Sequence, residues 1–273
     1  MSSSHERNDR KRTFRPGGEK GARGHRPPAR TRPDGPGAEW LWGWHAVVAA
    51  LANPRRDAPR RLLASAERAK ALAERFGALK TLETVEPAYI AQQLPPGAAH
   101  QGVALKAAPL EPVSIEDLGE PAEGVLLMLD QVTDPQNVGA IFRSAAAFGA
   151  RGLILQDRHA PALTGALAKA AAGAVDVLPC ARVTNLSRAL ERLADLGWRA
   201  VGLDGAAETP LETALDGRAT VLVMGSEGEG LRRLVAEHCD VLARIDMPGG
   251  FESLNVSAAA AVALYVAGRA RRR

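Results

Sequence analysis

Cysteine and histidine are scarce in this chain of 273 residues. The two cysteines, Cys180 and Cys239, lie far apart and belong to no CxxC or Cys/His pairing. The sequence therefore predicts neither a disulfide framework nor a zinc site, and it favours a reducing compartment. The 6 histidines are scattered, so no metal-binding cluster is indicated.

Long apolar runs are also lacking. No stretch approaches the roughly 20 residues that a bilayer-spanning helix needs. The Arg-rich first residues do not contain the hydrophobic segment of a secretory signal. We therefore expect no membrane segment and a cytoplasmic location. What remains is a globular composition, long enough for one large domain or two ordinary ones.

Charge is distributed unevenly along the chain. Residues 1–37 carry 10 Lys/Arg against 4 Asp/Glu, residues 38–106 carry 9 against 6, and residues 107–268 carry 12 against 21, a net −9. Residues 1–37 are rich in Arg, Gly and Pro with little to bury, which predicts a disordered basic tail. A basic first part followed by an acidic second part indicates a nucleic-acid partner. A tail that serves only solubility is the alternative.

Hydrophobic periodicity predicts two α/β domains joined by a linker. In 38–106 a helix ends at Asn53-Pro54, and further strands and helices alternate at 61–64, 66–76, 82–85, 87–94 and 103–106. The Pro-rich, acidic stretch 107–123 is expected to be the linker. In 124–273 we expect strands at 125–129, 152–155, 175–178, 200–203, 221–224 and 242–245, with helices at 138–148, 162–171, 186–196 and 231–237, and a last helix capped by Ser257. Continuous apolar strands alternating with helices predict a mostly parallel sheet covered on both faces, with ligands at the carboxyl ends of its strands.

Three segments follow such strand ends, and the first is residues 130–143. Asp134-Pro135 is expected to form a turn, Asn137 to cap the next helix, and Arg143 to project from its second turn. An amide and a guanidinium would then lie near one strand end. An ordinary helix cap with a surface arginine is the alternative.

The second segment is the glycine-rich run 225–230. Its order, G-x-x-G-x-G, matches neither the dinucleotide fingerprint nor the P-loop. Glu227 and Glu229 would repel a phosphate but would tolerate or attract a cationic ligand. A glycine turn with solvated acids is the alternative.

The third segment, residues 246–257, is rich in glycine, hydroxyl and amide groups and precedes the last helix. Neither a Ser/His/Asp order for hydrolysis nor an acid pair for glycosyl chemistry is found. Taken alone, this segment could be a long helix cap.

Together the three segments resemble the three motifs of the SpoU (TrmH) branch of the SPOUT RNA methyltransferases. The matching residues are Asn137-x5-Arg143, Gly225-x-Glu227 and 253–257, in this order. Residues 43–55 and 100–104 are similar to the small substrate-binding domain of the bacterial 23S rRNA guanosine-2′-O-methyltransferase group. This resemblance covers about residues 40–268. It implies an α/β fold with a trefoil knot in the methyltransferase domain, preceded by a small L30e-like α/β substrate-binding domain.

The resemblance also implies a cofactor and a set of site residues. S-adenosylmethionine would be the cofactor, with no metal, and it would be bound by Met224, Gly225, Glu227, Ile245, Met247, Ser253 and Leu254. The expected catalytic residues are Asn137, Arg143, Glu227 and Asn255. Arginine is a poor general base because its pKa exceeds about 12. We therefore expect Arg143 to clamp a phosphate and the developing alkoxide, and Glu227 to hold Arg143 or the loops. Asn137 and Asn255 are expected to fix loop geometry and to orient the nucleotide.

The same resemblance implies RNA as partner and a homodimer formed through the knotted domain. The substrate favoured is 23S rRNA; tRNA, or a non-catalytic role in RNA binding or ribosome assembly, is the alternative. Trp40, Trp42 and Trp44 are expected to anchor the core, with stacking on RNA bases as the other interpretation.

Overall fold

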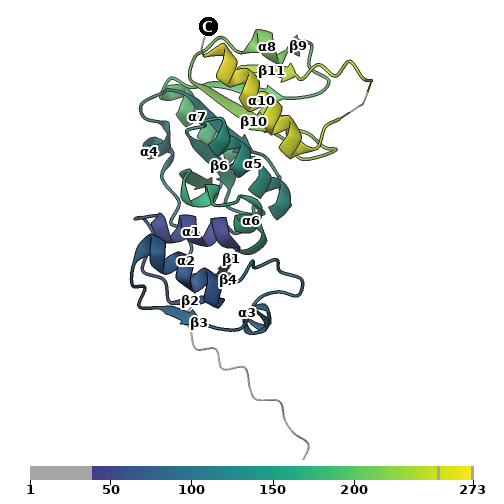
Figure 1. The fold of residues 1–273 in the computed structure, drawn as a ribbon. Helices are drawn as coiled ribbons and strands as arrows, with labels where there is room; N and C mark the ends of the chain where they lie inside the picture. The colour runs from purple at the N-terminus through teal and green to yellow at the C-terminus, as the bar shows by residue number, and fades with distance from the viewer. Residues whose placement is uncertain (1–38, 251–252, 272–273) are drawn as a thin grey trace, which may run out of the picture. The chain divides into compact units, whose positions relative to one another are not determined.

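The computed structural model describes residues 39–250 and 253–271 (Figure 1). The predicted basic tail, 1–37, lies outside the described residues. The first part of the described chain contains a four-stranded sheet with strand order β1-β4-β2-β3. Its elements are β1 (Glu39–Trp42), α1 (Trp44–Ala52), β2 (Arg61–Ala64), α2 (Ala66–Phe76), β3 (Leu82–Thr84), α3 (Pro87–Gln93) and β4 (Val103–Ala107).

This small sheet is buried on both faces. On one side Leu62 and Leu105 pack against Val47 of α1 and Leu72 of α2. On the other side Leu63 and its neighbours pack against Ile90 of α3. The helix expected to end at Asn53-Pro54 does so, and the strand 61–64 and the helix 66–76 form at the predicted residues.

The second part is built on a seven-stranded sheet in which all neighbouring strands are parallel, with order β7-β6-β5-β10-β8-β11-β9. Its strands are β5 (Val125–Leu129), β6 (Gly152–Gln156), β7 (Cys180–Val183), β8 (Arg199–Leu203), β9 (Thr209–Pro210), β10 (Thr220–Met224) and β11 (Val241–Arg244). Its helices are α4 (Ile115–Gly119), α5 (Pro135–Ala147), α6 (Gly165–Ala170), α7 (Leu186–Asp195), α8 (Leu211–Ala214), α9 (Arg233–Glu237) and α10 (Val256–Ala270). The mostly parallel α/β sheet predicted from the sequence is confirmed.

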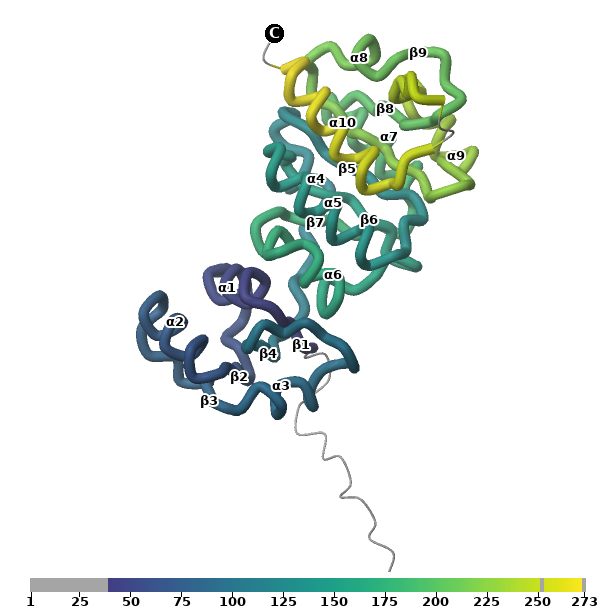
Figure 2. Tube along the Cα trace, turned by 45° about the vertical axis from the view of Figure 1, so that its right-hand side comes forward, coloured from purple at the N-terminus to yellow at the C-terminus, as the bar shows by residue number. Residues whose placement is uncertain are grey.

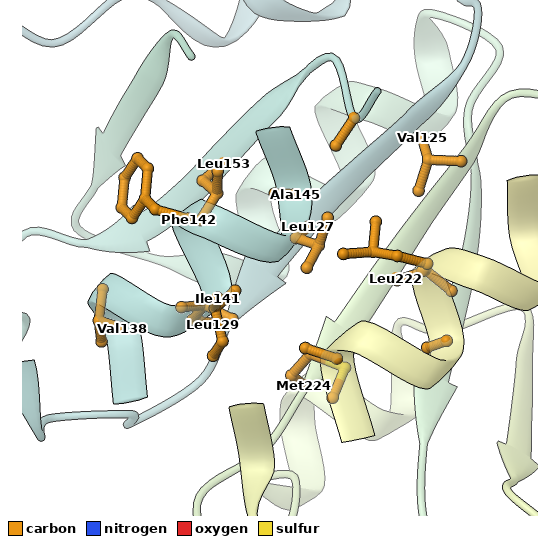
Figure 3. Packing of buried hydrophobic residues seen from close by; sticks show 14 of the residues in the cluster. Val125, Leu127, Leu129, Val138, Ile141, Phe142, Ala145, Leu153, Leu222 and Met224 are labelled. Carbon is orange, nitrogen blue, oxygen red and sulfur yellow. The ribbon is translucent and has the colours of Figure 1, made fainter. Parts of the chain in front are cut away.

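Helices cover both faces of this sheet because its central strands are apolar on both sides. In β5, Leu127 and Leu129 belong to the cluster packed beneath α5, α6, α8 and α10. The alternate residues Leu126 and Met128 face α4, α7 and α9. Figure 3 shows Ile141 and Ala145 of α5 beside Leu129 and Leu127. Helices α5 and α10, which are far apart in sequence, lie side by side (Figure 2).

Several predicted elements differ from the structure. The strand expected at 175–178 is wrong: a 3-10 turn occupies Ala174–Asp176, and the strand begins at Cys180. The predicted linker 107–123 contains α4, whose Leu118 is buried against the sheet. Strands β1 and β9 and helix α8 had no counterpart in the sequence prediction. Within the described residues no helix is long and apolar enough to cross a membrane. The trefoil knot stays a prediction.

Candidate active site

The first site segment connects β5 to α5. Asp134, and not Asn137 as predicted, caps the helix: its carboxylate accepts hydrogen bonds from the backbone N–H groups of Gln136 and Asn137. An N-cap residue lies outside the helix, whereas Asn137 already lies within the first turn of α5. Its side chain is thereby available for contacts outside the helix.

The second segment is a tight turn directly after β10. Ser226 and Gly230 form a two-way backbone pair. A Cβ on Gly225 would lie 2.1 Å from the carbonyl carbon of Gly230, so this close approach of the backbone requires glycine. The turn presents the exposed Glu227 at the carboxyl end of the sheet.

The third segment ends in the cap of α10, which is Asn255 and not the predicted Ser257. The Asn255 Oδ1 atom accepts hydrogen bonds from the backbone N–H groups of Ser257 and Ala258. The hydroxyl of Ser257 donates to the same oxygen at 2.6 Å. The amide nitrogen of Asn255 is left to donate elsewhere.

Three predicted catalytic residues meet at one carboxylate oxygen. Oε1 of Glu227 accepts hydrogen bonds from Nδ2 of Asn255 at 2.7 Å and from Nδ2 of Asn137 at 3.3 Å. It also accepts one from the backbone N–H of Val256 at 3.1 Å. Asn255 in addition donates to Oδ1 of Asn137 at 3.0 Å. We call Asn137, Glu227 and Asn255 the Asn-Glu-Asn triad; it ties together segments that are separated by 90 and 28 residues.

A buried carboxylate supports this arrangement. The Asp130 side chain is fully buried at the end of β5, and it accepts hydrogen bonds from the backbone N–H and the guanidinium of Arg232 at 3.0 and 2.7 Å. Its backbone N–H donates to Met224, the last residue of β10. Asp130 thus connects the first two segments. Asp130 was not among the predicted site residues, although an acid directly after an all-apolar strand is a detectable signal.

All seven predicted cofactor residues line one cavity of about 600 Å³ at the carboxyl ends of β8, β10 and β11. Met224, Ile245 and Leu254 provide apolar surface, while Asp204 and Glu229 join Glu227 as acids. Such a volume suits a cofactor-sized ligand. An apolar wall with carboxylates suits a ligand that has an apolar body and a positive charge. Asp204, the first residue after β8, was missed by the sequence analysis.

Arg143 is not part of the triad. It is exposed on α5, between that helix's buried Phe142 and half-buried Ser144, and it lines a different cavity with Gln136 and Ala146. Within the described residues no hydrogen bond or ion pair joins Arg143 to Glu227. The hydrogen bonds of Glu227 connect it to the first and third site segments instead.

The three tryptophans near the start of the described chain lie in or beside the small domain's core. Trp42 is buried, and Trp40 and Trp44 are half-buried against the same clusters. The guanidinium of Arg68 lies 4.8 Å from the ring centre of Trp44. The core-anchor interpretation fits these positions. In the described part of the chain, no group of three His, Cys, Asp or Glu side chains is placed to hold a metal ion.

Comparison with protein families gives two matches. The model of the SpoU rRNA Methylase family matches residues 124–265, which contain the triad and the cofactor-sized cavity. A second model, described as RNA 2′-O ribose methyltransferase substrate binding, matches residues 40–113.

Individual relatives agree with these matches. The 23S rRNA (guanosine-2′-O-)-methyltransferase RlmB of Xylella fastidiosa is 48% identical over 181 residues, covering 64% of this chain and 72% of that protein. An uncharacterized tRNA/rRNA methyltransferase of Mycobacterium avium is 44% identical over 177 residues, covering 63% of this chain but 57% of its own length. This chain therefore spans less than two thirds of the mycobacterial relative. Among solved structures, the AdoMet-bound rRNA methyltransferase of Sinorhizobium meliloti has a TM-score of 0.72 at 26% identity, covering 85% of this chain and 87% of that one.

Proposed function

Since this chain belongs to the SpoU rRNA methylase family, we propose that it transfers a methyl group from S-adenosylmethionine to a ribose 2′-hydroxyl of RNA, with a guanosine of 23S rRNA as the target. The observation that carries the proposal is the Asn-Glu-Asn triad, formed by all three site segments beside the cofactor-sized cavity. The 23S rRNA target rests on the 48% identity to the Xylella fastidiosa enzyme.

The cavity residues would hold the cofactor, whose sulfonium supplies an activated methyl group. The apolar Met224, Ile245 and Leu254 would contact its uncharged portions. The carboxylates of Asp204, Glu227 and Glu229 would favour its positive centre. The same carboxylates would repel a nucleotide with several phosphates. We therefore assign a cationic cofactor to this cavity.

In this proposal the triad fixes the loops and Arg143 acts on the RNA. Because Glu227 Oε1 receives three hydrogen bonds, the second and third segments are held at a defined distance from α5. Alignment of the attacking oxygen, the methyl carbon and the leaving sulfur depends on such fixed geometry. The permanently charged Arg143 binds a phosphate beside the target ribose and stabilises the oxyanion that forms as the 2′-hydroxyl loses its proton.

We assign RNA binding to residues 38–106 and methyl transfer to residues 124–273. The substrate-binding family match to residues 40–113 supports the first assignment. Residues 38–106 carry 9 Lys/Arg against 6 Asp/Glu and residues 107–268 carry 12 against 21, and this contrast supports the same division.

We also propose that two copies associate through α5 and α10. Phe148, which directly follows α5, is 44% exposed, and Val262 and Tyr265 of α10 are 38 and 51% exposed; the rings of Phe148 and Tyr265 lie 6.1 Å apart. Exposed apolar side chains that gather in this way are typical of a protein interface. Light scattering should give twice the chain mass for the wild type, and Tyr265→Glu should yield monomer. A monomeric wild type would contradict this assignment.

The experiment that tests the activity is transfer of labelled methyl from S-adenosylmethionine to protein-free 23S rRNA and, separately, to bulk tRNA, followed by mapping of 2′-O-methyl positions. Label at one guanosine of 23S rRNA is the expected result. Label confined to tRNA would keep the reaction and overturn the substrate. No label on either RNA or on a ribosome-assembly intermediate, despite measurable binding of cofactor and RNA, would favour the non-catalytic alternative.

A further inference from the structure

A second cavity, of about 740 Å³, contains the predicted catalytic residue that the triad leaves out. We call it the cationic cleft. Three segments form it: α1 with the preceding Gly43, the face of α5 that carries Gln136 and Arg143, and residues 169–174 with Val177. Its charged side chains are Arg143 and Lys169, and its described lining residues include no Asp or Glu. The cofactor-sized cavity, in contrast, contains three acids. The two cavities therefore suit ligands of opposite charge.

Lys169 is held firmly but its charge is not neutralised. Its Nζ donates to Oε1 of Gln101 at 2.7 Å, and the same oxygen accepts the backbone N–H of Trp44 at 3.0 Å. A Cβ on Gly43 would lie 2.6 Å from Nζ, so the lysine lies directly against the backbone of the small domain. Burial lowers the pKa of Lys169, and the one partner it has within the described residues is a neutral amide. A desolvated ammonium with one of its three donors used attracts an anion.

The cationic cleft begins next to the triad. Gln136 and Asn137 are consecutive residues in the first turn of α5; Gln136 lines the cleft, whereas Asn137 contacts Glu227. Arg143 follows Gln136 by seven positions, about two helical turns, so both lie on the same side of α5. A ligand bound along this side of α5 would reach the triad at the first turn.

We propose that the cationic cleft binds the sugar-phosphate backbone of a single RNA strand next to the methylated nucleotide, with Arg143 and Lys169 each contacting a phosphate and His45 at the rim. This inference rests on the proposed methyltransferase function and adds a second cation, Lys169, to its RNA site. A polyanion fits because the described lining residues provide two cations, Arg143 and Lys169, and no competing acid.

The test compares Lys169→Gln, Lys169→Arg and His45→Glu with wild type and with Arg218→Gln. Arg218 is a matched control because it is 67% exposed just before β10, outside the RNA-binding segment 38–106, and pairs with Asp216. His45 is exposed, so a glutamate there adds a negative charge to the cleft without filling a buried position. For each full-length variant, binding of protein-free 23S rRNA and of a short fluorescent single-stranded RNA is measured over a range of salt concentrations. Methyl transfer to the rRNA and affinity for S-adenosylmethionine are measured in parallel.

We expect Lys169→Gln to weaken RNA binding about tenfold at low salt, as for one lost charged hydrogen bond. The slope of log affinity against log salt should fall in magnitude by about 0.7, the value for one phosphate on a single strand. Lys169→Arg should restore the slope, His45→Glu should weaken binding, and Arg218→Gln should change neither quantity. Cofactor affinity should stay at the wild-type value throughout.

Unchanged affinity and slope in Lys169→Gln and His45→Glu would overturn the cleft proposal, even if the wild type methylates rRNA. A lower affinity with an unchanged slope would also overturn it, because that pattern indicates a structural role for Lys169. If Lys169→Gln reduces the salt slope but the wild type transfers no methyl group, the proposed activity is contradicted and the cleft is still supported as an RNA site.

Discussion

Replacing Asp176 by asparagine should destabilise the protein strongly, because this carboxylate is half of a buried ion pair. Arg56 donates to Asp176 through Nε at 2.5 Å and through Nη2 at 3.2 Å, and both side chains are almost fully buried, at 4 and 2% exposure. Asn53 donates to the same carboxylate at 3.0 Å. In Asp176→Asn the guanidinium keeps its charge, since arginine does not deprotonate in proteins, and it loses its counter-charge.

Asp176→Asn should lower the free energy of unfolding by about 3 kcal/mol, the lower end of the range for removing one partner of a buried ion pair. The lower end applies because Arg56 retains a hydrogen bond to the carbonyl of Ala108 at 2.9 Å. The control is Glu83→Gln. Arg61 also donates to Glu83 through Nε and Nη2, both at 2.7 Å, but the side chains of Arg61 and Glu83 are 28 and 45% exposed. Water screens an exposed pair, so the control should cost less than about 1 kcal/mol.

Urea unfolding of the full-length variants, followed by tryptophan fluorescence, measures both costs. Equal losses of stability in Asp176→Asn and Glu83→Gln would refute the reasoning, since burial would then have no influence. The double variant Arg56→Met with Asp176→Leu gives a second check. It should recover most of the lost stability, because replacing both charges by apolar groups removes the uncompensated ion.

Three further predictions concern the site, the pH dependence and the basic segment. Arg143→Ala should reduce methyl transfer by at least about 10²-fold, as expected for loss of a group that stabilises an oxyanion, while its cofactor affinity stays near the wild-type value. The control Arg158→Ala, at an exposed position after β6, should keep near wild-type activity; normal turnover in Arg143→Ala would remove Arg143 from the site. Hydrogen bonds to the carbonyl of Leu234 and to Glu191 raise the pKa of His238, so its contribution to stability is complete below the unfolded value of about 6.5 and is lost as pH rises through the raised folded value. Accordingly His238→Gln should destabilise at about pH 5.5 and have little effect at about pH 9, whereas equal effects at both would contradict the assignment. Deleting residues 1–37 should weaken RNA binding and reduce the slope of log affinity against log salt concentration, because 10 Lys/Arg are removed. Unchanged affinity at low salt would indicate that this segment serves only solubility.

The positions of the site segments were predictable because each follows an apolar strand of a parallel sheet. The carboxyl ends of such strands share one edge, so residues after β5, β10 and β11 must lie near one another. Which atoms meet was not predictable. Asn255 and Ser257 are both good helix caps, and propensity does not choose between them. Asn255 takes the position because its amide nitrogen is at the same time bound by Glu227 and Asn137.

The wrong strand at 175–178 has a similar cause. Val175 and Leu178 are buried while Val177 is 70% exposed, so the buried positions are three residues apart, as in a helical turn. Four residues with three apolar side chains satisfy either a strand or a turn, and periodicity cannot separate them over so short a run. Asp176 in this turn accepts the hydrogen bonds from Arg56 and Asn53, a long-range contact that no local pattern contains.

The acidic charge of residues 107–268 is consistent with RNA binding once its distribution in space is considered. A net −9 spread evenly would repel a polyanion from the whole domain. Three of its acids, Asp204, Glu227 and Glu229, lie at the cofactor-sized cavity, whereas the described residues that line the cationic cleft include Arg143 and Lys169 and no acid. Interactions between exposed charges fade over about 8 Å at physiological salt, so the sign of the nearest side chains outweighs the net charge. Because α5 contributes Asn137 to the triad and Arg143 to the cleft, a single helix fixes the distance between the proposed cofactor site and the proposed RNA-phosphate site. Methyl transfer from a sulfonium to a phosphate-linked ribose requires such a pair of sites at a constant separation.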